Sequence, residues 1–281
     1  MDYESFKDTV LHSITEYLPE ELQTCQVKLE TVRKVNVEKE AMTVRFGHRG
    51  LRLYLEETFL EYKAGQAFVV LMERMAMEIT NAIKDTEGLQ GQLETGGMLQ
   101  TVVLQLVCDK WNKELLEDVP HRKFLDMSIV YRVLLESRND SRRSILVTNT
   151  LMNKFGVTEE QLYRMAKVNT KRLLPTKAFD FGYEFCQMVV LTNSNSFYGA
   201  SCMLDTETLE KVAEAIDDDI YLLPSSQHEV LAVPCKEYVQ HDGLQQIVRE
   251  VNDSTVAKED WLSDQVYMYS RQSKEVSLVC Q

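Results

Sequence analysis

The sequence predicts an α+β fold, with mixed and largely antiparallel sheets, packed helices and two lobes. Apolar residues recur at helical spacing in some segments and alternate with polar residues in others. The two kinds of segment are interspersed without a repeated β-α-β rhythm, which disfavours a parallel sheet. The chain has 281 residues, and at about 150 residues per domain this length suits one large domain or two modest ones.

The composition is that of a folded, acidic protein. Hydrophobic residues make up 44% of the chain, and the formal net charge is −13. Because nucleic acids and anionic membranes attract positive fields, we expect neither as a partner. The chain starts without a secretory signal and has no apolar run near the ~18 residues of a membrane span. Its six cysteines form no C-x-x-C pair. We therefore expect a cytoplasmic protein with reduced cysteines.

Residues 1–85 predict an N-terminal α-β-β-β-α lobe. An apolar stripe over residues 2–18 ends at Pro19, which predicts an opening helix. Helical spacing returns over residues 56–84, and Gly65 is expected to end a first short helix there. Between these helices, alternating apolar and polar residues predict half-buried antiparallel strands near residues 25–29, 42–46 and 51–55.

Residues 86–98 hold four of the eleven glycines in the chain. Glycine favours turns and weakens helices, so this segment predicts a glycine-rich loop or linker. We place a lobe boundary here and expect residues 99–281 to form a larger C-terminal α+β lobe.

Helices and strands are both predicted in the C-terminal lobe. Thr158 and Gln161 form a T-x-x-Q capping box, which marks the start of one helix. A second helix is expected to begin at Asp205, and a third covers residues 242–252. Runs rich in β-branched and aromatic residues predict strands at 102–110, 128–135, 144–149, 187–193, 220–223, 229–233, 265–270 and 275–280.

Three sequences come close to known catalytic or binding motifs but are incomplete. Gly91 and Gly96 have the spacing of a phosphate-binding loop, without the Lys and Ser/Thr that must follow. Ser201 lies in a G-x-S-x-M run, where a nucleophile elbow needs a final Gly. His228 and Glu229 start like a zinc protease motif, but the second His is missing. We therefore expect no cofactor and no metal site.

The segment from Pro224 to Glu229 retains reactive side chains. Ser225 or Ser226 could act as a nucleophile with His228 as its base, and Asp264 could orient the imidazole. This would make the protein a Ser/His-type hydrolase. A structural turn is the favoured alternative, because sequence neighbours rarely reach catalytic geometry and proline and serine are common in turns.

The leading hypothesis is a cytosolic, non-catalytic module that binds a protein or a small molecule, because no catalytic signature is complete. The candidate binding residues are Tyr198, Pro224, Ser225, His228 and Glu229. A third hypothesis, nucleic-acid binding through Arg45, Arg49 and Arg52, requires these positive charges to gather on one face.

Motifs in both halves of the chain carry a family resemblance. They are Glu114–His121, Phe124–Asp126, Gly156–Glu160, Asn169–Thr170, Arg172–Pro175, Leu223–Ser226, His228–Glu229, Glu250–Asn252, Leu262–Asp264 and Tyr267. These motifs resemble an uncharacterised family of cytosolic bacterial proteins, common in Gram-positive gut anaerobes and designated only as a domain of unknown function. The resemblance extends from the opening helix to about Arg271. It implies no activity, cofactor or partner. A more remote similarity to another uncharacterised bacterial α+β family also implies a mixed fold.

Overall fold

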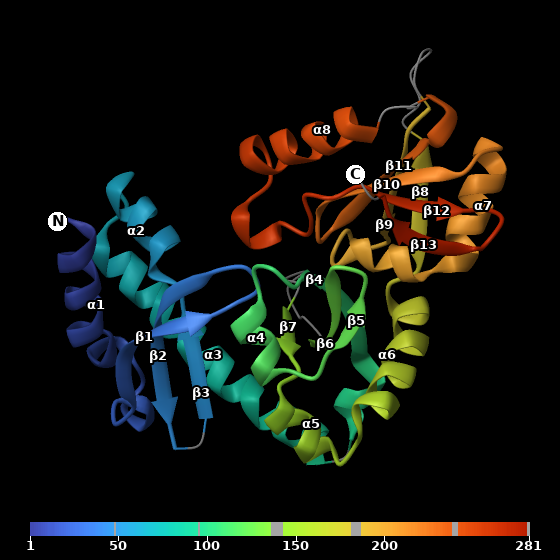
Figure 1. The fold of residues 1–281 in the computed structure, drawn as a ribbon. Coiled ribbons are helices and arrows are strands. Elements are labelled where there is room, and N and C mark those ends of the chain that lie inside the picture. Colours follow the sequence, from blue (N-terminus) through green and yellow to red (C-terminus); the bar gives the residue numbers. More distant parts are fainter. Residues whose placement is uncertain (48, 95, 136–142, 181–186, 238–240, 280–281) are drawn as a thin grey trace. The chain divides into compact units, whose positions relative to one another are not determined.

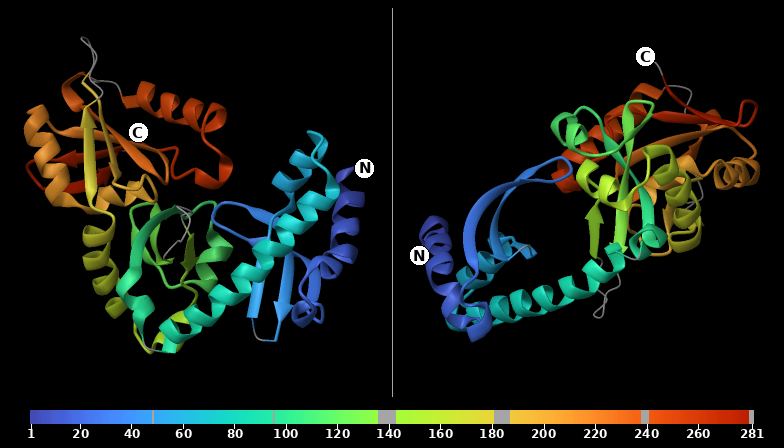
Figure 2. Two further views of the ribbon diagram at one scale, coloured as in Figure 1. Left: turned by 180° about the vertical axis from the view of Figure 1, so that it is seen from behind. Right: turned by 90° about the horizontal axis from the view of Figure 1, so that it is seen from below.

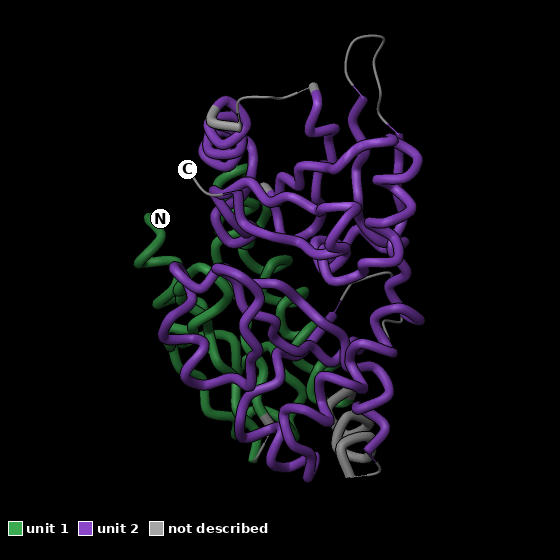
Figure 3. Tube along the Cα trace, turned by 45° about the vertical axis from the view of Figure 1, so that its right-hand side comes forward, with its two compact units in different colours: residues 1–95 green, residues 96–281 purple. Residues whose placement is uncertain are grey.

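The computed structural model (Figure 1) describes the chain except residues 48, 95, 136–142, 181–186, 238–240 and 280–281. The chain divides into two compact units, Met1–Thr95 and Gly96–Gln281 (Figure 3). In the described residues, helices accompany three sheets whose strand pairs are antiparallel. The predicted α+β class is confirmed.

Unit 1 contains a three-stranded sheet in the order β1-β2-β3, with helices before and after it. Asp2 caps the first helix by accepting a hydrogen bond from the Ser5 N–H, and Pro19 follows the end of that helix. Gly65, at a φ of 101°, separates the two later helices, as predicted. The elements are α1 Tyr3–Tyr17, η1 Glu20–Leu22, β1 Gln26–Arg33, β2 Glu38–Phe46, β3 Arg49–Leu53, α2 Leu55–Lys63 and α3 Phe68–Glu94.

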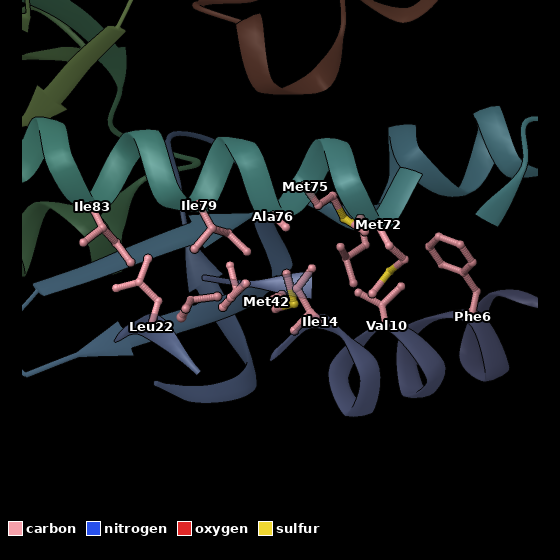
Figure 4. Close-up of a cluster of buried hydrophobic side chains, with 13 residues drawn as sticks. Phe6, Val10, Ile14, Leu22, Met42, Met72, Met75, Ala76, Ile79 and Ile83 are labelled. Carbon is pink, nitrogen blue, oxygen red and sulfur yellow. The ribbon is translucent and has the colours of Figure 1, made fainter. Parts of the chain in front are cut away.

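The core of unit 1 is formed by α1, α3 and the sheet (Figure 4). The apolar stripe of α1 contributes Phe6, Val10 and Ile14, which are fully buried. Met72 and Ile79 of α3 are also fully buried in this cluster. Burying a side chain of this size contributes about 1.5–3 kcal/mol relative to leaving it exposed. The helical spacing in the sequence therefore marked the residues that hold this unit together.

The glycine-rich segment 86–98 differs from the predicted loop. Helix α3 continues through Gly88 and Gly91 to Glu94, and Figure 2 shows it as one long helix. Each glycine costs about 1 kcal/mol relative to alanine inside a helix. However, the Leu, Gln and Glu residues around these glycines favour helix, and extending an existing helix is easier than starting one. The division between the two units falls at 95/96, inside the same segment.

The first part of unit 2 is a four-stranded sheet with α6 packed against β4. In this sheet β6 pairs with β4 on one edge and with β5 and β7 on the other. The predicted capping box of Thr158 and Gln161 begins α6 and is confirmed. The elements are η2 Gly97–Thr101, β4 Val102–Cys108, α4 Lys113–Asp118, β5 Arg122–Phe124, β6 Met127–Leu135, β7 Arg143–Leu146, α5 Asn149–Phe155 and α6 Glu159–Leu173.

The second part of unit 2 is a six-stranded antiparallel sheet in the order β13-β12-β10-β11-β9-β8. Helix α8 packs against β10, and the short helix η3 contacts β9, β11 and β4, so it lies between the two sheets of this unit. The elements are β8 Thr176–Asp180, β9 Val189–Asn193, η3 Gly199–Leu204, α7 Thr206–Ile216, β10 Ile220–Ser226, β11 Glu229–Pro234, η4 Cys235–Glu237, α8 His241–Ser254, η5 Lys258–Asp260, β12 Tyr267–Ser270 and β13 Glu275–Leu278.

Short elements account for most of the differences from the sequence predictions. Helices α4 and α5 have six and seven residues, so their periodicity is too brief to stand out. Strand β7 ends at Leu146, whereas the sequence predicts a strand up to Asn149, because Thr148 caps α5 by accepting from the Leu151 N–H. Strands β5 and β8 were not predicted.

Candidate functional site

The segment from Pro224 to Glu229 forms the end of a β-hairpin. Strands β10 and β11 pair in register at Leu223 and Leu231, and the pairing shifts before Ser226 faces Glu229. Gln227 and His228 form the turn between the strands. The turn that the sequence favoured is therefore present at this position.

The imidazole of His228 is engaged through both ring nitrogens. Its Nδ1 lies 3.3 Å from the backbone nitrogen of Tyr198, and its Nε2 lies 3.0 Å from Asp260 Oδ1. A backbone N–H can only donate, so Nδ1 accepts and the ring proton is on Nε2, facing the carboxylate. No ring lone pair then remains to take a proton from a serine.

Of the predicted hydrolase residues whose side chains the structure describes, Ser226 and Asp264 form their hydrogen bonds away from this ring. The Ser226 hydroxyl accepts from the backbone N–H of His228 at 2.9 Å, which is a turn contact. Asp264 accepts from Asn252 Nδ2 at 3.0 Å, and the acid at His228 is Asp260 instead. Ser225 belongs to β10, but its side chain lies outside the described residues.

The remaining predicted binding residues have different surroundings. Pro224 is buried and Glu229 is exposed. Tyr198 is buried, and its ring lies 6.1 Å from that of His228 in a stacked arrangement. Tyr198 and His228 are joined by a hydrogen bond from the Tyr198 backbone N–H to His228 Nδ1. They are the pair so joined among the predicted binding residues whose side chains the structure describes.

Of the arginines in the nucleic-acid hypothesis, Arg45 on β2 and Arg52 on β3 are exposed diagonal neighbours on one face of the unit 1 sheet. Arg45 pairs with Glu30 at 3.1 Å, which neutralises its charge. The side chain of Arg49 is not among the described parts.

A chain of side-chain hydrogen bonds joins the hairpin turn to the four-stranded sheet. Arg132 Nε donates to Gln105 Oε1 at 2.7 Å, and Gln105 Nε2 donates to Gln227 Oε1. Gln227 Nε2 then donates to Asp260 Oδ1 at 2.7 Å. Both glutamines are buried, so these partners satisfy amides that would otherwise cost free energy. We interpret the predicted segment as a structural junction between the two sheets.

Gly199 lets the backbone approach this junction closely. A Cβ atom at this position would lie 2.1 Å from the carbonyl oxygen of His228 and 2.3 Å from Thr192 Oγ1. Only glycine fits there without a shift of the backbone, so its place in the sequence reflects packing rather than a nucleophile elbow.

An open pocket of about 640 Å³ lies elsewhere in unit 2. It is formed by the end of β4, the start of α4, the β5–β6 hairpin and the segment that leads into β12. Small-molecule sites typically have volumes of about 300–1,000 Å³. The residues that line it are Cys108, Asp109, Lys110, Trp111, Lys113, Leu116, His121, Lys123, Asp126, Ser128, Ser263, Asp264 and Gln265.

The carboxylates of this pocket have different partners. Asp109 pairs with Lys123 and also accepts from the Ser128 hydroxyl at 2.5 Å. Asp126 accepts from the Tyr267 hydroxyl at 2.6 Å, and Asp264 accepts from the Asn252 amide. Within the described part of the chain, Asp126 and Asp264 therefore have neutral hydrogen-bond donors and no ion pair.

Two cations complete the charges of the pocket. Lys110 and Lys113 line it, are exposed, and form no ion pair with any residue that the structure describes. Trp111 lies between them in sequence, and its ring packs against Trp261 at 5.4 Å. The pocket thus contains the ammonium groups of Lys110 and Lys113 and the carboxylates of Asp126 and Asp264. None of these four groups forms an ion pair with a described residue.

Burial raises the pKa of two further groups of this region. Burial is the main cause of the raised pKa of the Cys108 thiol, and the negative charges of Asp126 and Asp264 raise this pKa further. Burial and the nearby Asp126 likewise raise the pKa of Tyr267, which stays protonated and donates to that carboxylate. Cys108 therefore has less thiolate character than an exposed cysteine.

The chain matches a family model over residues 3–183 and 177–271. It belongs to DUF5688, a family of unknown function. The predicted membership of an uncharacterised family is confirmed. No curated protein and no solved structure matches the chain. Among the described residues, no helix is long and apolar enough to cross a membrane, and no cluster of three or more His, Cys, Asp or Glu residues could hold a metal ion.

The pocket was missed at the level of sequence because its lining comes from distant segments. Asp126 and Ser263 lie close to one Tyr267 hydroxyl but are separated by 137 positions in the chain. A signal was nevertheless present, since three motifs of the family resemblance contribute to this lining. These residues are Leu116, His121, Asp126, Ser263 and Asp264.

Proposed function

We propose that this DUF5688 protein is a non-catalytic binding module for a small zwitterionic ligand, such as an amino acid or a short peptide. The site is the pocket lined by Lys110, Lys113, Asp126 and Asp264. The observation that carries the proposal is the presence of both signs of charge in one pocket, with neither neutralised by an ion pair among the described residues.

The two signs of charge suit the two ends of a zwitterion. The ammonium groups of Lys110 and Lys113 can bind a carboxylate, and the carboxylates of Asp126 and Asp264 can accept from an ammonium group. Trp111 adds an aromatic surface to the lining. Hydrogen bonds to charged groups contribute about 1.5–3 kcal/mol each, so losing one charged end should weaken binding at least about tenfold.

A non-catalytic role is supported by the state of the reactive groups. The Cys108 thiol is buried and neutral, and the His228 ring has both nitrogens engaged away from the pocket. We further propose that the protein works in the cytoplasm of a bacterium. The described cysteines are free, which suits a reducing compartment, and the family resemblance carries the bacterial origin.

Calorimetric titration with matched ligands tests this proposal. We expect L-phenylalanine to bind at least about tenfold more tightly than phenethylamine or phenylpropionate, which each lack one charged end. A panel of other amino acids and dipeptides, each with its matched amine and carboxylate, defines the preferred side chain. If no zwitterion of the panel binds more tightly than its two analogues, the proposal is wrong.

Variants of the pocket provide the second part of the test. The double variant Lys110→Gln/Lys113→Gln should weaken the binding of the zwitterion at least about tenfold. Its matched control is Lys154→Gln/Lys211→Gln, which removes the same charge from exposed residues of α5 and α7. Equal affinities of the two double variants would contradict the assignment of the site.

A further inference from the structure

A second polar cluster lies on one face of the four-stranded sheet of unit 2. The register pairs Arg132 with Val103 and with Leu146, so Gln105 and Ser144 are its diagonal neighbours on the two adjacent strands. Diagonal neighbours in an antiparallel sheet share a face. The three side chains therefore form a stripe across β4, β6 and β7.

Arg132 is a cation without a carboxylate partner in the residues that the structure describes. Its Nε donates to Gln105 Oε1, and its Nη1 lies 3.3 Å from Ser144 Oγ. The guanidinium lies over the Tyr198 ring, 5.1 Å from the ring centroid. Burial lowers the pKa of Arg132, yet an arginine stays charged at neutral pH. Buried charges are normally paired with an opposite charge, whereas the hydrogen-bond partners of Arg132 among the described residues are neutral.

The chain of hydrogen bonds through Asp260 does not neutralise this cation directly. Asp260 lies at the far end of the chain, beyond the side chains of Gln105 and Gln227. Its Oδ1 accepts from Gln227 and from His228. Nη2 of Arg132 has no acceptor among the described residues.

One hydroxyl hydrogen of Ser144 or Tyr198 also lacks an acceptor within the cluster of Arg132, Ser144 and Tyr198. Ser144 Oγ and the Tyr198 hydroxyl lie 3.0 Å apart, and Arg132 Nη1 donates to Ser144. If Ser144 donates to Tyr198, the Tyr198 hydrogen has no acceptor within this trio. If Tyr198 donates to Ser144, the Ser144 hydrogen has none. In either arrangement, one hydroxyl hydrogen and the Nη2 hydrogens need an acceptor from outside.

Solvent can reach this cluster. Arg132 and Ser144 are both partly exposed, while the Tyr198 ring beneath them is buried. Water can serve as the acceptor, but a negatively charged oxygen would bond more strongly to the guanidinium and would balance its charge.

We propose that Arg132, Ser144 and Tyr198 form a second binding site, which takes the oxyanion of a carboxylate or phosphate group. None of these residues lines the pocket assigned to the zwitterion, so this site is independent of that proposal. The Nη2 group of Arg132 and the surplus hydroxyl hydrogen can donate to the oxygens of either group, and the charge of the guanidinium strengthens these bonds.

Two probe anions, inorganic phosphate and acetate, test the second site. We expect at least one of them to bind the full chain in calorimetric titrations at constant ionic strength, and to raise the midpoint of thermal unfolding more than chloride does. Whichever of phosphate and acetate binds more tightly identifies the preferred oxyanion. Binding of neither anion at concentrations up to about 100 mM, where even a contact worth only ~1.4 kcal/mol would be detected, overturns the proposal.

Variants locate the anion on the cluster. Tyr198→Phe keeps the ring and removes the hydroxyl, and we expect it to weaken anion binding about tenfold. Tyr221→Phe is the matched control, because the Tyr221 hydroxyl forms no hydrogen bond with the described residues, and it should leave the affinity unchanged. Arg132→Lys keeps the charge but loses the planar fork, and it should weaken binding by a similar factor. If Arg132→Lys does not fold, Tyr198→Phe carries the test.

The variant Lys110→Gln/Lys113→Gln separates the two sites. It removes two ammonium groups that can themselves bind an anion, so it should weaken zwitterion binding while the phosphate or acetate binding that depends on the Tyr198 hydroxyl persists. Loss of anion binding in this variant, or equal affinities of Tyr198→Phe and the unmodified protein, would contradict the second site.

Discussion

His228 and Asp260 form a hydrogen bond of 3.0 Å, although they are 32 positions apart in the sequence. The same carboxylate oxygen also accepts from Gln227 at 2.7 Å. Asp260 thus fixes both residues of the β10–β11 turn and attaches this turn to the segment that precedes β12. This carboxylate therefore acts as a structural anchor.

Removing the Asp260 carboxylate should destabilise unit 2. In Asp260→Ala, the Gln227 amide and the His228 ring lose a shared acceptor, and each polar group left without one costs about 1–3 kcal/mol. We expect the free energy of unfolding to fall by about 2–4 kcal/mol in urea titrations. Asp253→Ala is a matched control, because Asp253 is an exposed residue of α8, and it should change stability by less than about 0.5 kcal/mol. Equal stabilities of the two variants would show that Asp260 is not an anchor.

Alanine substitutions at two glycines should have opposite effects. A Cβ at Gly199 would lie 2.1 Å from the His228 carbonyl, so Gly199→Ala should cost more than about 4 kcal/mol or prevent folding. Gly243 lies in α8, and an added Cβ there would meet none of the described atoms within 4 Å, so Gly243→Ala should stabilise the protein by about 1 kcal/mol. Urea unfolding monitored by circular dichroism measures both changes. A small effect at Gly199 would contradict the close approach of η3 to the hairpin.

Truncating a core residue of unit 1 should cost far more than truncating an exposed one. Ile14 of α1 is fully buried in the core of unit 1, and Ile14→Ala should reduce the free energy of unfolding by about 2–5 kcal/mol. Leu60 on α2 is 66% exposed, and Leu60→Ala should change the free energy of unfolding by less than about 0.5 kcal/mol. Thermal and urea unfolding of the full chain provide the comparison. A similar cost at both positions would mean that the stripe of α1 is not a core.

Stability should decrease above pH 9 in part because of Cys235. Burial, helped by the charges of Asp218 and Asp219, raises the pKa of this thiol to about 12 from an ordinary value of 9.0. A group whose pKa is raised by folding stabilises the folded state fully below its unfolded pKa. That contribution is lost as the pH rises from about 9 towards 12. Urea titrations from pH 7 to about 10.5, which spans the unfolded pKa, should therefore show a shallower decline for Cys235→Ala than for the unmodified protein. Parallel declines would show that the thiol ionises equally in both states.

Periodicity in the sequence predicted the larger elements well. The stripe from Phe6 to Ile14 and the capping box of Thr158 and Gln161 are local signals, and the structure contains both helices that they indicate. Gly88 and Gly91 misled the prediction, since a local preference against helix was outweighed by the residues around them.

The candidate sites could be predicted less well because their geometry is long-range. The sequence indicated Tyr198 and His228 separately, but nothing local identified Asp260 as the acid or Arg132 as part of the same network. The pocket similarly depends on contact between the β5–β6 hairpin and the segment before β12, which no short motif encodes.

The bond between Gln105 and Gln227 has a fixed polarity. Arginine can only donate and an ionised aspartate can only accept, so Arg132 and Asp260 impose the same orientation from opposite ends. Turning over either amide alone would bring nitrogen against nitrogen or oxygen against oxygen at this contact. The two sheets of unit 2 are therefore connected by a directional link, in which Arg132 sets the rotamer of Gln105 on its own sheet and Asp260 sets that of Gln227.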